Sequence, residues 1–262
     1  MQQIILGIIQ GITEWLPISS SGFTIIFMSG FLNITDLDFL IHTSLFLHLG
    51  TFLAALIYFR KDVWNILKSI AKYKDSSEET QKILKFLIIA TLISGAIGIL
   101  ILQMIYHYES ELAVTGRTIT GFIAILLLFT GFIQLKKKKI GLRQESNLKT
   151  KDGIFLGIAQ GFSSLPGISR SGITISTLLL RNFNDTSALR LSFLMSLPII
   201  LAGNILLNIN NFTLTTPAFY GLLTAFVFGL ATIHGMISVS KRINFGWFAL
   251  VFGILMLISL LI

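Results

Sequence analysis

The sequence predicts an all-α integral membrane protein, built as an inverted-topology repeat of about six transmembrane helices plus two re-entrant helical hairpins. Three observations predict this class: the composition, the lengths of the apolar runs and a motif that occurs twice. Hydrophobic residues make up 53% of the 262-residue chain, charged residues 12%, and the mean hydropathy is +0.82. This composition suffices for one helical bundle but leaves too little polar surface for a soluble domain, so we expect a single membrane domain over residues 1–262.

The apolar runs define the crossings. Runs of the length needed to cross roughly 30 Å of hydrocarbon lie at residues 38–59, 86–106, 118–135, 187–208, 217–240 and 245–262. Residues 2–30 and 153–182 differ, because each has two apolar halves separated by a break of Pro, Ser and Gly. Each half would be about 18 to 22 Å long as a helix, too short to cross, so we expect re-entrant hairpins.

The charged residues indicate orientation. The formal net charge is +8, and residues 60–85 and 136–151 carry seven Lys and Arg each. Positive charge in short loops sets membrane orientation, so both loops are expected in the cytoplasm and no nucleic-acid partner is expected. The first half of 60–85 has the pattern of an amphipathic interfacial helix. Trp15, Trp64 and Trp247 are expected to be interface anchors.

One motif occurs twice, 150 residues apart. Residues 6–25, "LGIIQGITEWLPISSSGFTI", and residues 156–175, "LGIAQGFSSLPGISRSGITI", are identical at eleven of twenty positions. Three predicted crossings separate the copies, so the second would enter the membrane from the opposite side. We therefore divide the chain into repeat 1 (1–135), a basic cytoplasmic linker (136–151) and repeat 2 (152–262).

The breaks in the two hairpins predict an anion site. In inverted repeats, broken helices meet near the membrane midplane, and their N-termini offer free N–H groups and a positive dipole end. The copies differ where Glu14 pairs with Ser164 and Ser20 pairs with Arg170. The guanidinium fork of arginine fits phosphate oxygens, so phosphate is the expected anion. The alternatives are that Glu14 and Arg170 only pair with each other or snorkel, and that the serines only allow close helix packing.

These motifs resemble a known family. "GIIQGITEWLPISSSG", "LPGISRSGITIS" and "HLGTFLAALIYFRKD" (48–62) are similar to segments of the undecaprenyl-diphosphate phosphatases of the bacitracin-resistance type. The resemblance covers essentially the whole chain. It implies a multi-pass enzyme of the plasma membrane that releases inorganic phosphate from a polyprenyl diphosphate, recycling the lipid carrier for cell-surface glycans. The catalytic region would face the outer side.

The resemblance also implies roles for individual residues. Glu14, Ser20 and Arg170 would be catalytic, with Ser20 the candidate nucleophile. The residues expected to bind substrate are Gln10, Ser19, Ser21, Gly22, Ser169, Ser171, Gly172 and Thr174. Glu14 is also the candidate ligand for Mg²⁺ or Ca²⁺, which would bind together with substrate phosphates. The expected partners are the polyprenyl diphosphate lipid, the membrane and, as an oligomer, a homodimer.

Two departures from the family pattern leave two hypotheses open. Gln10 stands where the family has its first Glu, and Phe23 stands where it usually has His. Neither replacement can act as a general base. Either Glu14 activates Ser20 or a water while Arg170 stabilises the phosphoryl oxygens, or the protein is a polyprenyl-phosphate flippase without hydrolase activity. The phosphatase is favoured because Glu14, Ser20 and Arg170 all remain. A histidine inside a helical bundle more often packs there with its hydrogen bonds satisfied than takes part in a site. His48 is nevertheless near enough to the first hairpin to approach the site.

Overall fold

A computed structural model describes residues 1–16, 18–34, 36–108, 141–165, 168–208, 215–239 and 246–259, with eight isolated positions between 121 and 135. In these residues the regular structure is helical, apart from an isolated bridge between Arg143 and Phe183. Four of the described helices are long and apolar enough to cross a membrane: Asp38–Tyr58, Glu78–Met104, Asp185–Asn208 and Thr216–Ser238. The all-helical, multi-pass membrane class is thereby confirmed. The predicted crossing at 118–135 lies mostly outside the described residues.

The long helices follow the apolar runs closely. They are α3 (Leu37–Tyr58), α5 (Glu78–Tyr108), α9 (Asp185–Gly203), which continues as a π-helix over Asn204–Asn208, and α10 (Thr216–Val239). The last run forms the shorter α11, Gly246–Ser259. Side chains fix where two of them begin: the Asp36 carboxylate accepts from the backbone N–H of Asp38, and the Asn184 amide oxygen accepts from that of Ser187.

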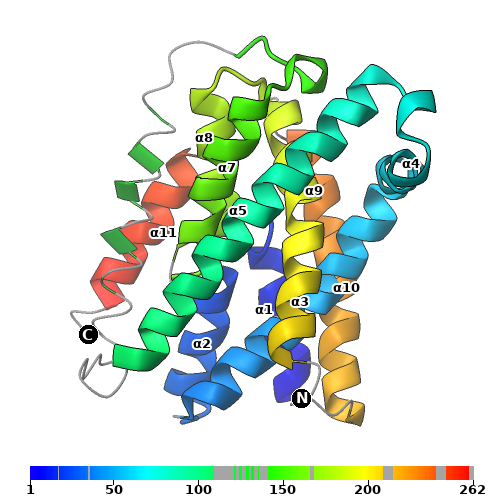
Figure 1. Ribbon diagram of the computed structural model, residues 1–262. Coiled ribbons are helices and arrows are strands. Elements are labelled where there is room, and N and C mark those ends of the chain that lie inside the picture. The colour runs from blue at the N-terminus through cyan, green and yellow to red at the C-terminus, as the bar shows by residue number, and fades with distance from the viewer. Residues whose placement is uncertain are drawn as a thin grey trace.

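Each copy of the repeated motif forms two short helices around a break. The first copy gives α1 (Gln2–Thr13) and α2 (Ser20–Phe31), and the second gives α7 (Thr150–Phe162) and α8 (Arg170–Leu180). The break ends in the same way in both, because the hydroxyls of Ser19 and Ser169 accept from the N–H groups of Gly22 and Gly172, at 3.2 and 3.0 Å. Figure 1 places α1 and α2 in the lower half of the molecule and α7 and α8 in the upper half.

Each hairpin packs on a long helix from the other part of the chain: α1 lies along α10, and α7 lies along α5. Small residues allow this approach. A Cβ atom added to Gly11 would lie 2.8 Å from the carbonyl oxygen of Ala225 and 2.8 Å from the nitrogen of Gly229. At the tip of the first hairpin, Glu14 and Trp15 are 5% and 0% exposed, so the tip lies inside the bundle.

The three tryptophans differ in their exposure to solvent. Trp15 is fully buried and packs edge-on against Phe193, with ring centroids 4.8 Å apart. The prediction that it anchors the chain at the membrane interface is therefore wrong, because the residue next to Glu14 is carried inside with the hairpin. Trp64 and Trp247 are exposed.

Residues 60–85 and the described part of the second basic loop, 141–151, lie at the end of the molecule where α7 begins (Figure 1). These residues include α4 (Arg60–Ala71) and the short 3₁₀ helices Tyr73–Asp75 and Glu145–Asn147. Asp152, at the start of α7, accepts from Arg143 at 2.6 Å and also pairs with Arg181. Burial alone would raise the pKa of Asp152, but the hydrogen bonds from Arg143 and Arg181 hold it below its usual value. This pair of guanidinium groups ties the loop after residue 140 to both ends of the second hairpin.

Candidate active site

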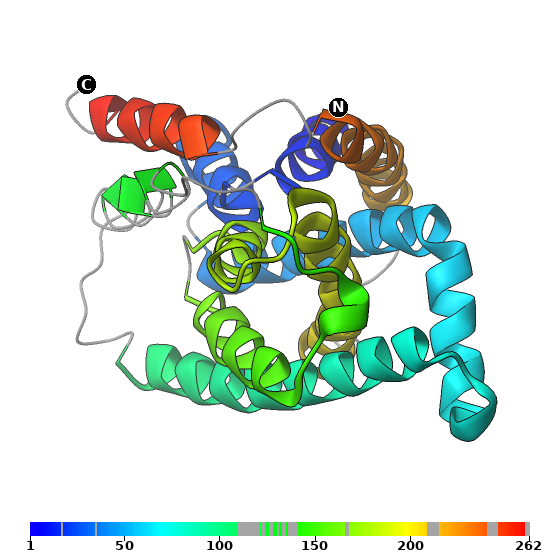
Figure 2. The same cartoon turned by 90° about the horizontal axis from the view of Figure 1, so that it is seen from above.

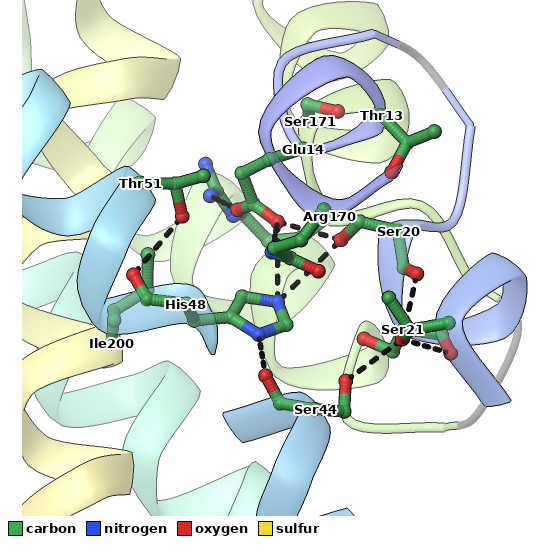
Figure 3. Close-up of polar contacts among 12 residues, drawn as sticks. Thr13, Glu14, Ser20, Ser21, Ser44, His48, Thr51, Arg170, Ser171 and Ile200 are labelled. Atoms are coloured by element: carbon green, nitrogen blue, oxygen red, sulfur yellow. Dashed lines mark hydrogen bonds and ion pairs between the residues drawn. The ribbon is translucent and has the colours of Figure 1, made fainter. Parts of the chain in front are cut away.

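Glu14 lies at the C-terminal end of α1 and is 5% exposed. Its Oε2 atom accepts hydrogen bonds from the Ser20 hydroxyl at 2.6 Å and the Gln10 amide at 2.9 Å, and it lies 3.1 Å from His48 Nε2. Its Oε1 atom forms an ion pair with Nη2 of Arg170 (Figure 3). A buried carboxylate is tolerated when it is paired and hydrogen-bonded, and this one uses both oxygens.

The two hairpins meet at this carboxylate. Ser20 is the first residue of α2 and Arg170 is the first residue of α8, so equivalent positions of the repeat converge on Glu14. Ser171 extends the contact by donating a 2.5 Å hydrogen bond to the carbonyl oxygen of Leu16. Two helix N-termini and one guanidinium therefore face the same point, which is the arrangement that favours an anion.

A cavity of about 170 Å³ opens beside this cluster. One side is polar and comes from the two hairpins, and the other includes apolar residues of α3 and α9. Its lining residues are Glu14, Ile18, Ser19, Ser20, Ser21, Leu45, His48, Ser163, Ile168, Arg170, Ser171, Ile199 and Ile200. A cavity with charged and hydroxyl groups on one side and an aliphatic wall on the other suits the polar head of an amphiphile.

The sequence-predicted residues separate into two groups. Glu14, Ser20, Arg170, Ser19, Ser21 and Ser171 line the cavity. The others lie around it: Gln10 contacts Glu14 from behind, Ser169, Gly22 and Gly172 belong to the two helix caps, and Thr174 shares a 2.7 Å hydrogen bond with Ser192 of α9. The second group positions the first.

His48 also lines the cavity, and from the sequence we expect only that it could approach the site, with no role assigned. Its Nδ1 atom lies 2.7 Å from the carbonyl oxygen of Ser44. A carbonyl can only accept, so Nδ1 carries a proton and Nε2 is the atom that faces Glu14 and, at 3.5 Å, the Ser20 hydroxyl. The available signal was an ionisable residue inside an apolar run, which marks functional sites in membrane proteins. Phe23 is not part of the cavity lining and packs in a cluster with Ile18 and Ala124.

Gln10 acts differently from the glutamate that it replaces. A second carboxylate would repel Glu14, whereas the Gln10 amide donates to it. In the described part of the chain, the Gln10 side-chain oxygen is buried without a hydrogen-bond partner. Gln10 therefore orients an ionised Glu14 and contributes no charge of its own.

The described residues contain no group of three His, Asp or Glu side chains that could hold a metal ion. Glu14 offers a single carboxylate, and both of its oxygens already accept contacts from protein donors. The cavity therefore has no preformed cage for a divalent cation.

Long apolar helices, two pairs of short helices and a buried Glu–Ser–Arg cluster define an all-helical membrane protein with a charged, polar cavity between its broken helices. The family model described as "Bacitracin resistance protein BacA" matches residues 3–257, and the chain belongs to this family. It is similar to the undecaprenyl-diphosphatase of Methanococcoides burtonii, with 39% identity over 99% of this chain and 97% of the relative. The undecaprenyl-diphosphatases of Methanothrix thermoacetophila (34%, 98% and 95%) and Haloarcula marismortui (33%, 95% and 93%) are similar over comparable lengths.

Proposed function

We propose that this protein is a hydrolase that removes the terminal phosphate of undecaprenyl diphosphate or a similar polyprenyl diphosphate, and so recycles the lipid carrier for cell-surface glycans in the plasma membrane. Family membership and the names of the relatives support this function. The observation that carries it is the convergence of a serine hydroxyl, a carboxylate and a guanidinium on one cavity between the two hairpins.

The chemistry that we propose starts at Ser20. Its Oγ atom attacks the terminal phosphorus while the bridging P–O bond breaks, and polyprenyl monophosphate leaves. As the Ser20 hydroxyl turns away from Glu14, to which it donates in the free protein, its proton passes to His48 Nε2 and then to the leaving phosphate. A water molecule next attacks the phosphoserine, gives its proton to Nε2 and releases inorganic phosphate, and Nε2 returns the proton to Ser20. Catalytic hydrogen bonds are often long before substrate binds, so the 3.5 Å separation of Ser20 and His48 is compatible with this role.

Arg170 and Glu14 would share the electrostatic work. Arg170 has five N–H donors and pairs with Glu14 through one terminal nitrogen, which leaves donors for phosphoryl oxygens. Glu14 holds the Ser20 hydroxyl at 2.6 Å and stabilises a cationic His48. Stabilisation of developing phosphoryl charge by prepositioned donors is typically the largest single contribution to such catalysis.

We also propose the finer architecture: an inverted-topology repeat with six crossings and two re-entrant hairpins, divided at residues 1–135, 136–151 and 152–262. The reciprocal packing of α1 on α10 and α7 on α5 supports it. So does the position of the hairpins in opposite halves of the molecule (Figure 1).

We further propose that a divalent cation binds together with the substrate and that the protein forms a homodimer. Because the Glu14 oxygens are already engaged, Mg²⁺ or Ca²⁺ would be held chiefly by the diphosphate oxygens, with Glu14 as its ligand from the protein. The flippase alternative uses the same cavity but gives no role to a serine held by a carboxylate and a histidine. The names of the relatives also favour the phosphatase.

The test is phosphate release from undecaprenyl diphosphate by the purified protein in detergent, with and without Mg²⁺ or Ca²⁺. Arg170→Ala and Glu14→Gln should each lower kcat by about 10²- to 10³-fold. Arg60→Ala and Asp38→Asn are matched controls at exposed positions and should leave release unchanged. A wild-type protein that binds the lipid without releasing phosphate would overturn the enzyme and make lipid flipping in vesicles the next assay.

A further inference from the structure

Helix α4 has one broad apolar stripe, and the bundle covers only part of it. Val63 and Ile66 pack against the main hydrophobic core. Trp64, Leu67 and Ile70 form the outer side of this stripe, the outer face, and are 59%, 53% and 64% exposed. Within the described part of the chain, no segment covers this outer face. Three neighbouring large apolar residues exposed on one helix are typical of a surface that contacts a membrane or another molecule.

The outer face is bordered by cations. Residues 60–75 contain five Lys and Arg against two Asp, and one of these, Asp62, is paired with Arg190 at 2.6 Å. Lys68 lies with its Nζ atom 5.1 Å from the centre of the Trp64 ring. An amphipathic helix with Trp and Leu on one face and Lys beside them is the pattern that binds an anionic membrane surface.

The placement of α4 fits this pattern. Viewed from above, α4 lies at the edge of the molecule and connects the ends of α3 and α5 (Figure 2). In the side view it is seen end-on, across the direction of the long helices (Figure 1). A helix at the end of the spans and perpendicular to them lies at the level of the lipid head groups.

A hollow beside α4 offers room for a head group. Its volume is about 630 Å³, within the usual range of small-ligand sites. Lys68 and Lys72 line it from α4, and Ser77 and Thr80 line it from the start of α5, with Asp75 as its one acidic lining residue. Two ammonium groups and two hydroxyls can bind a phosphate. Lys68 also contacts Trp64, so the hollow adjoins the outer face, against which the acyl chains of a bound lipid would lie.

We propose that α4 is a docking surface for anionic phospholipid, with the head-group phosphate between Lys68 and Lys72 and the acyl chains against Trp64, Leu67 and Ile70. The surface holds the connection between α3 and α5 at the membrane boundary. This site is separate from the cavity at Glu14 and does not depend on the phosphatase chemistry.

The test uses Trp64 as a reporter. In a Trp247→Phe background, the other tryptophan, Trp15, is fully buried. The protein is reconstituted in equimolar phosphatidylcholine and phosphatidylglycerol, with bromine on the acyl chains of one lipid or the other. Bromine on phosphatidylglycerol should quench Trp64 more strongly, by about two- to fivefold, because one lysine near the surface favours anionic lipid by up to about fivefold.

Lys68→Gln and Lys72→Gln should each move this quenching ratio toward one. Lys151→Gln removes an exposed charge outside α4 and the hollow, and it should leave the ratio unchanged. Equal quenching by the two brominated lipids in the wild type would overturn the preference for anionic lipid. Absence of quenching by either would mean that water or a second protein copy covers α4. A lower ratio in Lys151→Gln would indicate a general charge effect in place of a site.

Discussion

At the scale of single residues, the proton on His48 decides how the candidate site works. The Ser44 carbonyl fixes a proton on Nδ1, so only Nε2 can gain or lose one. Nε2 faces Glu14 of α1 at 3.1 Å and Ser20 of α2 at 3.5 Å, and Arg170 of α8 lies across the same carboxylate. An imidazole oriented by an acceptor on one nitrogen and facing a hydroxyl with the other has the geometry of a general base.

We expect His48→Gln to lower kcat for phosphate release by about 10²- to 10⁴-fold, the usual contribution of general acid–base catalysis. KM should change little, because Arg170 and the helix N-termini remain. Wild-type activity should fall at low pH, where Nε2 is already protonated, and the variant should lack this decline. His234→Gln, at an exposed position in α10, is the matched control. If His48→Gln keeps the acid limb of the profile, a different group takes the proton.

Sequence and structure differ instructively at this scale. Glu14, Ser20 and Arg170 could be found from the sequence, because the repeat aligns Glu14 with Ser164 and Ser20 with Arg170 and exposes the asymmetry. His48 has no such signal, because only the packing of α3 against the first hairpin brings it to Glu14. Trp15 differs from the prediction for a related reason. The preference of tryptophan for membrane interfaces predicts an interfacial side chain, but this preference does not reveal that the helix before Trp15 ends inside the bundle.

At the scale of elements, close helix packing holds the hairpins in place. Gly11→Ala would press a methyl group against backbone atoms of α10, 2.8 Å from both the Ala225 oxygen and the Gly229 nitrogen, and backbone cannot move aside as a side chain does. We expect a loss of about 1 to 3 kcal/mol in the free energy of unfolding, the typical cost of overpacking. Gly95→Ala in α5 has open space around its Cβ and should be neutral or slightly stabilising. Thermal unfolding in detergent compares the two, and equal melting temperatures would contradict the packing argument.

The paired guanidinium groups at Asp152 predict a pH dependence of stability. The lowered pKa of Asp152 means that its stabilisation is complete above the usual aspartate value and is lost as the pH falls through the lowered one. Asp152→Asn should reduce the free energy of unfolding by about 2 kcal/mol near neutral pH, because both ion pairs are lost. The loss is smaller than for a fully buried pair, because Arg143 and Arg181 are about a quarter exposed to water. Melting temperatures of the wild type and the variant should therefore converge in acid. Asp75→Asn, at an exposed position, should follow the wild type at every pH.

Apolar runs predicted the spans well and their ends less well. The predicted crossing at 38–59 is α3, Leu37–Tyr58, but the helix predicted from residue 86 begins at Glu78. The additional two turns are polar, and a Glu78–Lys82 ion pair of 2.6 Å joins successive turns there. Hydropathy marks where a helix enters hydrocarbon, whereas helix propensity and side-chain pairs decide how far it projects into water.

At the scale of the whole molecule, charge and topology agree. In the described residues, every Lys and Arg except Arg170 lies at the end of the bundle where α7 begins. Arg170 alone is carried inward, to Glu14. The overall class and the broken hairpins followed from periodicity and the repeat. The reciprocal packing of α1 on α10 and α7 on α5 could not, because it depends on contacts between segments about 70 to 220 residues apart.

The absence of cysteine from the sequence makes the proposed topology directly testable. If the first hairpin is re-entrant, Gln2→Cys and Asp38→Cys lie on the same side of the membrane, because α1 and α2 enter and return together. Lys74→Cys and Lys151→Cys should lie on the other side, as the clustering of positive charge requires. A membrane-impermeant maleimide applied to intact cells should label the first pair alone, and permeabilised cells should show all four. Labelling that separates Gln2→Cys from Asp38→Cys would mean that α1 and α2 together form a complete crossing. The repeat would then not be inverted, and the convergence of two half-helices on Glu14 would need another explanation.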